Sequence, residues 1–340
     1  MQVKHKAMDF VRLGAALAMS QGHRKDAEGV AIARWGADSP ALRLVKAGVP
    51  AGSTQDGSWG EPLTESERAG AAFFEAVAEL SVIGRMRSLR RVPAHVPCLT
   101  RVANFGAEWR GEGKARPLDA AVFDQEQLEL CDLGVLTVVT RELLEHGSRL
   151  AEQALTASLV TAVADALDQA FLDPTNAGVA TVRPASITHG VDPVTVETTL
   201  TEAVGDMVAE FAGDVEAAYF ILHPATAARL SGADHPGLGI RGGEFLGAPA
   251  LTSRHAPPGK ITLADGAGIA LAEGSAGIST SAHATVEMRD DPVGDGGAPT
   301  AATQVSLWQT DLRAMLVSRR INWQVIRPGS VAVLDLEGDD

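Results

Sequence analysis

The longest regular pattern of apolar and polar positions along the chain runs from Arg141 to Leu172. Apolar or small side chains recur there every three or four residues, which is the period of one helix face. Thr140 is a suitable N-cap, and Pro174 stops the pattern because proline cannot continue the helical hydrogen bonds. We therefore expect one helix over 141–172, about 50 Å long, with Gly147 as its weakest position. Its apolar or small positions are Leu144, Ala151, Leu155, Leu159, Ala162, Val163, Ala166, Ala170 and Phe171.

The segment before this helix has the period of strands. Apolar and polar residues alternate over 96–109 and again over 122–140. The charged, turn-forming sequence RGEGKARPLD joins the two stretches, so the pattern predicts a long two-stranded ribbon. An isolated two-stranded ribbon is marginally stable in water. The ribbon therefore implies a partner chain beneath it, and its functional interpretation is assembly.

Shorter patterns occupy the rest of the chain and make the fold class α+β. A Gly-, Ser- and Pro-rich linker follows the first helices, and a glycine-rich loop interrupts the second half. The first 60 residues lack a long apolar face and resemble an arm that needs another surface to fold against. Helices are predicted over 6–20, through Trp35, over 40–45, 64–84 and 196–212 and after His223, and strands at 217–224, in short pieces over 250–274, at 284–291, 305–326 and 330–336.

Composition and charge limit the classes of protein to which this chain can belong. The 340 residues favour two packed domains, or one domain with long extensions. The formal net charge of −14 argues against nucleic-acid binding as the main function. Residues 1–60 carry a net charge of +3 and the remainder −17. A basic arm on an acidic body suggests docking on a neighbour or a polyanion, although a solvated helix face is an equal alternative.

Four arginines form a dense basic cluster that could grip acidic side chains or phosphates. Isolated clusters of this kind are more often solvated surface, and both interpretations stay open. The cluster consists of Arg85, Arg87, Arg90 and Arg91.

The sequence offers little that resembles a catalytic or cofactor site. Gly237, Gly239 and Gly242 have dinucleotide-loop spacing, but a strand-like stretch rather than a helix follows them, so we expect a chance match. The histidines match no common zinc spacing, so we expect no metal, no cofactor and no enzyme. Cys98 and Cys131 form no disulfide framework, which favours a reduced compartment. No apolar run reaches the ~20 residues of a membrane span. The histidines concerned are His223, His235, His255 and His283.

Several segments, in order, resemble the major capsid proteins of tailed bacteriophages with the Hong Kong 97-type fold. The resemblance covers about residue 35 to the end. Each motif is weak alone, and together they are fairly specific. The matching positions are Trp109, Gly111, Glu112, Gly113 and Pro117, then Thr140, Glu142, Leu143 and Leu144, then Phe171, Leu172 and Asp173, followed by the segments LHPATAARL, FLGAPALTS, ITLADGAGIALAEG and the closing SLWQTDLRAMLVSRRINWQVIRPGSVAVL.

The resemblance implies a Hong Kong 97-type capsid fold built from four parts. These are an N-terminal arm, an extended β-hairpin loop, a peripheral domain with a long spine helix, and an axial domain. The implied bounds are 1–62 for the arm, 92–139 for the extended loop, 63–91 with 140–194 and 301–340 for the peripheral domain (spine helix 141–172), and 195–300 for the axial domain.

The implied function is that of a major capsid protein in the virion, assembled in the host cytoplasm. Its chief partner is itself, in hexamers and pentamers of an icosahedral shell that encloses DNA without sequence-specific binding. Scaffold, maturation protease, portal and decoration proteins are further implied partners, and no membrane is. The extended-loop tip, with Trp109, Glu112, Lys114 and Arg116, is the expected inter-subunit contact.

Two alternatives and one departure accompany this interpretation. An encapsulin-like nanocompartment shares the fold, and a nucleotide-dependent α/β enzyme would use the loop around Gly239. Some relatives weld subunits through a Lys–Asn bond. Lys114 lies at the ribbon tip, but residues 289–305 hold no asparagine, so we expect no such crosslink.

Overall fold

A computed structural model of the chain shows an α+β protein that divides into two compact units. Unit 1 combines Met1–Val77, Gly134–Val163 and Ala276–Arg319, and unit 2 combines the rest of the chain. The residues that the structure describes are 2–20, 24–45, 72–101, 123–146, 148–196, 199–232, 234–288 and 304–336.

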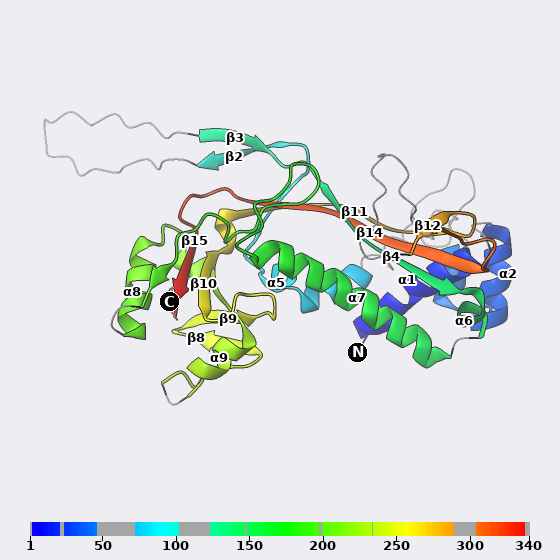
Figure 1. Cartoon of the computed structure of the whole chain (residues 1–340), viewed down its shortest axis with the longest axis horizontal. Helices are drawn as coiled ribbons and strands as arrows, with labels where there is room; N and C mark the ends of the chain where they lie inside the picture. Colours follow the sequence, from blue (N-terminus) through cyan, green and yellow to red (C-terminus); the bar gives the residue numbers. More distant parts are fainter. Residues whose placement is uncertain are drawn as a thin grey trace, which may run out of the picture. The chain divides into compact units, whose positions relative to one another are not determined.

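Three short helices open unit 1 and pack on one another: α1 (Gln2–Met19), α2 (Arg24–Trp35) and α3 (Pro40–Val45). They confirm the N-terminal helices predicted from periodicity, although α1 begins four residues earlier. Val11, Leu13 and Ala16 are buried on α1. The surface that these helices need comes from the same chain, because Gly14 faces the side chains of Ile278 and Met315. Helix α1 also contacts α6 (Arg141–His146), and Figure 1 shows these two helices close together.

The predicted helix over 141–172 is two helices, α6 and α7 (Arg149–Leu172). Thr140 caps the first as expected, since its Oγ1 accepts a hydrogen bond from Leu143 N at 3.2 Å. Ser148 starts the second in the same way, with its Oγ accepting from Ala151 N at 3.3 Å. A second cap after the weak helix former Gly147, which lies outside the described residues, favours a new helix over continuation.

Helix α7 buries one stripe of its surface with the predicted spacing. Leu159, Val163 and Phe171 are buried on that stripe, together with the polar residues Thr156 and Asp168. By length and composition alone α7 could cross a membrane, with a mean hydropathy of 1.3. Half of that apolar stretch is buried inside the protein.

The helix predicted over 64–84 is also divided, and its first part lies outside the described residues. Residues 72–80 are helical, and α5 (Val82–Arg85) follows after Ser81. Ser81 Oγ accepts a hydrogen bond from Gly84 N at 3.2 Å, so a new N-cap again explains the division.

The second strand predicted for the ribbon, over 122–140, is two strands in different sheets. β3 (Phe123–Gln127) pairs with β2 (Pro97–Arg101) in the ribbon, whereas β4 (Cys131–Thr140) joins a four-stranded sheet. Leu128, which lies between the two strands, is 2% exposed and packs in a core cluster with Ala270, Ala272 and Ile326. Burial of this side chain therefore ends the ribbon and redirects the chain.

The four-stranded sheet has the order β1-β11-β14-β4. β1 (Arg90–Val92) runs parallel to β11 (Ile269–Ser281). β14 (Leu312–Val325) is an internal strand, and β4 is a terminal one. Figure 1 shows β11 and β14 side by side over a long distance. The stretch predicted as one strand over 305–326 is β13 (Gln304–Ser306), a turn, and β14; β13 pairs with β12 (Thr285–Glu287).

Unit 2 is built on a mixed seven-stranded sheet of order β5-β15-β10-β6-β9-β8-β7. Its core contains Met207 of α8 (Leu200–Glu210) and the rings of Phe220 and Phe245, which meet edge to face at 5.0 Å. The predicted short helix is α9 (Pro224–Leu230), with His223 as its N-cap. The strands are β5 (Val194–Thr195), β6 (Ala218–Leu222), β7 (Leu238–Gly239), β8 (Gly242–Phe245), β9 (Ala248–Thr252), β10 (Lys260–Asp265) and β15 (Val331–Asp335).

The glycine-rich stretch predicted as a loop forms the small hairpin β7–β8 and leads into β9. Gly242 and Gly243 have φ values of 88° and 135°, which only glycine adopts readily. A Cβ at Gly242 would also collide with the Ala250 carbonyl oxygen. These glycines therefore allow the tight β7–β8 hairpin to form at the edge of the sheet.

Candidate functional site

The ribbon is described only along its stem. β2 and β3 are antiparallel, with Pro97 opposite Gln127 and Arg101 opposite Phe123. In the part of the chain that the structure describes, no third strand pairs with them. The four predicted contact residues of the tip, Trp109, Glu112, Lys114 and Arg116, lie outside the described residues.

The four arginines of the predicted cluster differ in their exposure to solvent. Arg85 is half-buried and donates hydrogen bonds to the carbonyl oxygens of Ser81, at 3.3 Å, and Thr252, at 2.7 Å. Burial lowers the pKa of Arg85, and nearby Asp168 opposes that change. Arg87, Arg90 and Arg91 are exposed, and Arg91 pairs with Glu273 at 2.9 Å. A contact role for the three exposed arginines stays a prediction.

Asp168 is a buried carboxylate that ties α7 to two other segments of unit 2. Its Oδ1 accepts a hydrogen bond from Val82 N at 2.7 Å, and its Oδ2 accepts one from Ser253 Oγ at 2.7 Å. Burial raises the pKa of this carboxyl, and the hydrogen bonds oppose the rise. The site fixes α7 against the start of α5 and the end of β9.

Asp165, a second acid on α7, contacts the loop that follows β9. Asp165 forms an ion pair with Arg254, and its Oδ1 lies 3.2 Å from His255 Nε2. The backbone N–H of His255 also donates to Ser253 Oγ at 3.3 Å. Asp165 and Asp168 thus engage the same short loop from one helix. Sequence reasoning missed both, because their partners lie more than eighty positions away.

Glu152 organises the N-terminal helices of unit 1. Its carboxylate accepts hydrogen bonds from Arg12 Nε at 3.0 Å and Trp35 Nε1 at 3.1 Å. Arg313, whose side chain is 5% exposed, donates to the carbonyl oxygen of Ala18 at 3.0 Å. These contacts attach α1 and α2 to α7 and β14.

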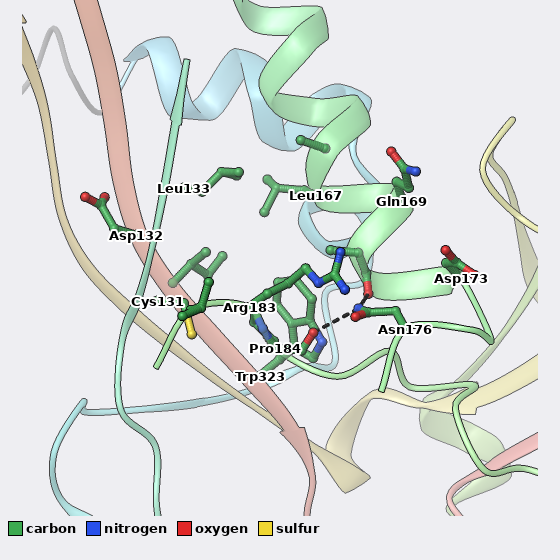
Figure 2. A pocket seen from close by; sticks show the side chains of 14 residues that line it. Cys131, Asp132, Leu133, Leu167, Gln169, Asp173, Asn176, Arg183, Pro184 and Trp323 are labelled. Atoms are coloured by element: carbon green, nitrogen blue, oxygen red, sulfur yellow. Dashed lines mark hydrogen bonds between the residues drawn. The ribbon is translucent and has the colours of Figure 1, made fainter. Parts of the chain in front are cut away.

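Unit 2 also contains a groove of about 240 Å³ beside the first residues of β4. Figure 2 shows Leu133 of β4 and Leu167 of α7 lining it from two sides, with Trp323 of β14 below. Trp323 is held in place, because its ring meets Phe171 edge to face at 5.4 Å and its Nε1 donates to Ala185 O at 2.8 Å. The groove therefore has a rigid apolar floor.

The rest of the groove lining is mostly polar, and hydrogen bonds hold part of it in place. Asn176 donates through Nδ2 to the carbonyl oxygens of Ala170, at 2.8 Å, and Pro184, at 2.9 Å (Figure 2). Hydrogen bonds from Thr175 lower the pKa of Asp173, which keeps this carboxylate charged. The other rim residues are Asp132, Gln169, Val182 and Arg183.

His223 and the three glycines weighed for metal or nucleotide chemistry have structural roles. His223 Nδ1 accepts from Ala225 N at 3.1 Å, which caps α9. Gly237, Gly239 and Gly242 lie on or before the β7–β8 hairpin, so no helix N-terminus follows them to hold phosphate. Within the described ranges, no group of three or more histidine, cysteine, aspartate or glutamate residues is arranged to hold a metal ion.

The fold is similar to those of several solved structures from phages and from a GTA particle. A structure from Gordonia phage Cozz has a TM-score of 0.54 at 16% identity, covering 76% of this chain and 87% of that one. A structure from Mycobacterium phage Adephagia has a TM-score of 0.52 at 18% identity, covering 76% and 91%. The capsid of a native GTA particle has a TM-score of 0.50 at 15% identity, covering 77% and 90%. At sequence identities of 15–18%, these similarities show the fold of the chain and no more than the fold.

Sequence comparison identifies the family. The chain is 32% identical to the capsid polyprotein of Pseudomonas phage PAJU2, over 96% of this chain and 53% of that protein, so it spans about half the length of this relative. The model of the phage capsid family matches residues 66–336. The chain belongs to the phage capsid family. Over residues 66–336 it is a structural protein of the virion capsid, which contradicts the interpretation of the loop around Gly239 as the site of a nucleotide-dependent enzyme.

Proposed function

We propose that this chain is the major head protein of a tailed double-stranded DNA bacteriophage or prophage. Its copies form the hexamers and pentamers of an icosahedral shell around the genome. The observation that carries the proposal is the family match over residues 66–336, which includes most of both compact units. The likeness of the fold to the capsid of a GTA particle supports it.

Four parts of the subunit divide the work in this proposal. Residues 1–62 form the arm, 92–139 the extended loop, and 195–300 the axial domain around the seven-stranded sheet. The peripheral domain contains 63–91, 140–194 and 301–340, with α7 as most of its spine helix. The ribbon stem supports this division, because β2 and β3 are paired only with each other among the described residues.

Charged contacts between neighbouring subunits complete the proposal. The tip residues Trp109, Glu112, Lys114 and Arg116 would contact the neighbouring subunit, and the exposed Arg87 and Arg90 offer further basic contacts. The net charge of −14 keeps packaged DNA from adhering to the wall. A maturation protease is among the proposed partners, because the relative from phage PAJU2 is described as a polyprotein.

Electron microscopy of the expressed protein tests this function. We expect closed icosahedral particles, or hexameric and pentameric rings, from the chain alone or with its neighbouring head proteins. Enclosed DNA in particles from infected cells identifies a phage head, and an enclosed enzyme identifies a nanocompartment. A monodisperse monomer or dimer under every condition would contradict the proposal.

A further inference from the structure

Two short connections carry the chain between the seven-stranded and the four-stranded sheet. The turn Gly266–Gly268 joins β10 to β11, and residues 326–330 join β14 to β15. The connections are hydrogen-bonded to each other. Asp265 N donates to Ser330 O at 2.8 Å, and Ile326 N donates to the carbonyl oxygen of the last glycine of the turn at 2.9 Å. Their conformation therefore sets the direction in which β11 and β14 meet the seven-stranded sheet.

Asp265 is a fully buried carboxylate at this crossing of the chain. Its Oδ1 accepts a hydrogen bond from Ala267 N at 2.8 Å. Its Oδ2 accepts two, from Asp214 N at 3.0 Å and from Arg327 Nη1 at 2.7 Å. A buried carboxylate needs such partners, and the bond from a guanidinium is the strongest of them. The Arg327 side chain is 34% exposed, so this partner can exchange the carboxylate for water without crossing the core.

Ser330 is a buried hydroxyl beside this carboxylate. It is 0% exposed, and its Oγ has no hydrogen-bond partner among the residues that the structure describes. A buried hydroxyl without a partner costs free energy, so its retention here needs a physical reason. The hydroxyl and the carboxylate face one small space over Gly268. A Cβ placed on that glycine would lie 2.7 Å from Ser330 Oγ and 3.1 Å from Asp265 Oδ2.

The occupancy of Asp265 Oδ2 explains why the hydroxyl has no partner. A carboxylate has about four acceptor positions, two on each oxygen. Both positions of Oδ2 are taken, by Asp214 N and by Arg327. Ser330 therefore finds no acceptor there while the arginine is bound. Departure of the arginine would free one position, and rotation of the serine about χ1 would bring a new donor to it.

We propose that Asp265 is a two-state switch with two alternative partners. In the state described here Oδ2 binds Arg327, and in a second state the arginine leaves and Ser330 Oγ donates in its place. The second state frees residues 326–330 from one of their attachments, so β11 and β14 meet the seven-stranded sheet in a different direction.

This inference rests on the proposed function, because a shell of hexamers and pentamers needs one chain in more than one curvature. The charged partner makes the arginine-bound state the lower in free energy for an isolated subunit. Contacts that a subunit makes in a ring shift the populations when they favour one state over the other. The switch supplies the second state at a modest cost, since the buried carboxylate keeps three hydrogen bonds in both states.

The first test is a double-mutant cycle on the free subunit, followed by thermal unfolding. Ser330→Ala alone should leave the Tm unchanged or raise it, since the hydroxyl has no partner to lose. In the Arg327→Met background the same change should lower the Tm by about 3 °C or more, because the serine is then the donor to Asp265. Ser186→Ala is the matched control, since Ser186 is also buried and its Oγ donates to Phe171 O at 2.8 Å. It should have the same effect in both backgrounds. An equal effect of Ser330→Ala in the two backgrounds would overturn the inference.

The second test needs no change at the arginine, so it applies even if Arg327→Met does not fold. The amides of Ile326 and Arg327 both donate to Gly268 O, and they exchange with solvent when this connection opens. Ser330→Ala should slow their hydrogen exchange by about threefold to tenfold, because it removes the donor that stabilises the open state. Exchange in α8 should not change. A merely structural role of the serine predicts faster exchange instead, and unchanged or faster exchange would reject the switch.

Particle shape separates this inference from the proposed function. Ser330→Ala holds the subunit in one state, so it should lower the yield of closed particles by about tenfold in favour of tubes or open sheets. Ser186→Ala should still give closed particles. Closed particles from both variants in equal yield would contradict the role of the switch in assembly. If the unaltered chain forms no particles, the proposed function fails, whereas the hydrogen-exchange result still decides whether the switch exists.

Discussion

Asp168 is a carboxylate on the mainly apolar stripe of α7, and its surroundings control its ionisation. Burial raises its pKa above the value in the unfolded chain. The folded state therefore binds the proton more tightly, so this residue contributes stability below the unfolded pKa of about 3.9 and loses it as pH rises through the folded pKa. Asp173 is the opposite case, since hydrogen bonds from Thr175 lower its pKa. Its contribution is present above the unfolded pKa and disappears as pH falls through the folded pKa.

These two carboxylates predict opposite pH slopes. Relative to the unaltered chain, Asp168→Asn should remove a loss of stability with rising pH, and Asp173→Asn should remove a loss with falling pH. Urea unfolding from pH 3 to pH 7, followed by tryptophan fluorescence, measures both. Parallel curves for the unaltered chain and Asp168→Asn would contradict the assigned burial effect.

Gly84 predicts a steric effect at a single residue. A Cβ there would collide with the backbone of Ala78, which is not a flexible neighbour. Gly84→Ala should lower the free energy of unfolding by about 2 to 3 kcal/mol. Gly205 in α8 has open space around it, and Gly205→Ala should raise that free energy by about 0.5 to 1 kcal/mol through helix propensity. Thermal or urea unfolding distinguishes the two; equal effects would refute the close approach.

At the scale of elements, helices α1 and α2 depend on one side chain of α7. Arg12, Arg34 and Trp35 all converge on Glu152, at 3.0, 3.8 and 3.1 Å. A carboxylate with several donors at low exposure contributes more than a surface ion pair. Glu152 is therefore a shared attachment point of α1 and α2, beside the hydrogen bond from Arg313 to Ala18.

Removing that charge should loosen the helices without unfolding the protein. Glu152→Gln is expected to cost about 1 to 2 kcal/mol and to speed amide hydrogen exchange in α1 and α2. Glu145→Gln is the matched control, since Glu145 pairs with the exposed Arg141 on the same helix, α6. Faster exchange across the whole chain, rather than in these helices, would show that Glu152 is not a local attachment.

Much of the element order could be predicted from the sequence, and the failures have a common physical origin. Thr140 was a recognisable cap, and the period of three and four located the buried stripe of α7. The break before Arg149 was missed because the apolar period continues through it, while the choice depends on Ser148. The division of 122–140 depends on Leu128 and its distant core neighbours. The groove is lined by four separate segments of the chain, so no local sequence pattern predicts it.

At the scale of the whole molecule, the ribbon is expected to serve assembly and not folding. Its stem pairs only with itself in the described part of the chain, and the cores of both units are formed by other segments. Deleting residues 108–119 should therefore leave the unfolding transition unchanged and abolish closed shells. Calorimetry and negative-stain microscopy measure the two outcomes, and normal shells from the deletion would refute the role of the ribbon.

The two sheets receive their last strands late in the sequence. β14 lies between β11 and β4, and β15 lies between β5 and β10, so both are internal strands supplied by the final part of the chain. A subunit still being translated thus lacks the middle of each sheet, and its partly made edges cannot yet close. Neither sheet is therefore complete until these late strands have been synthesised.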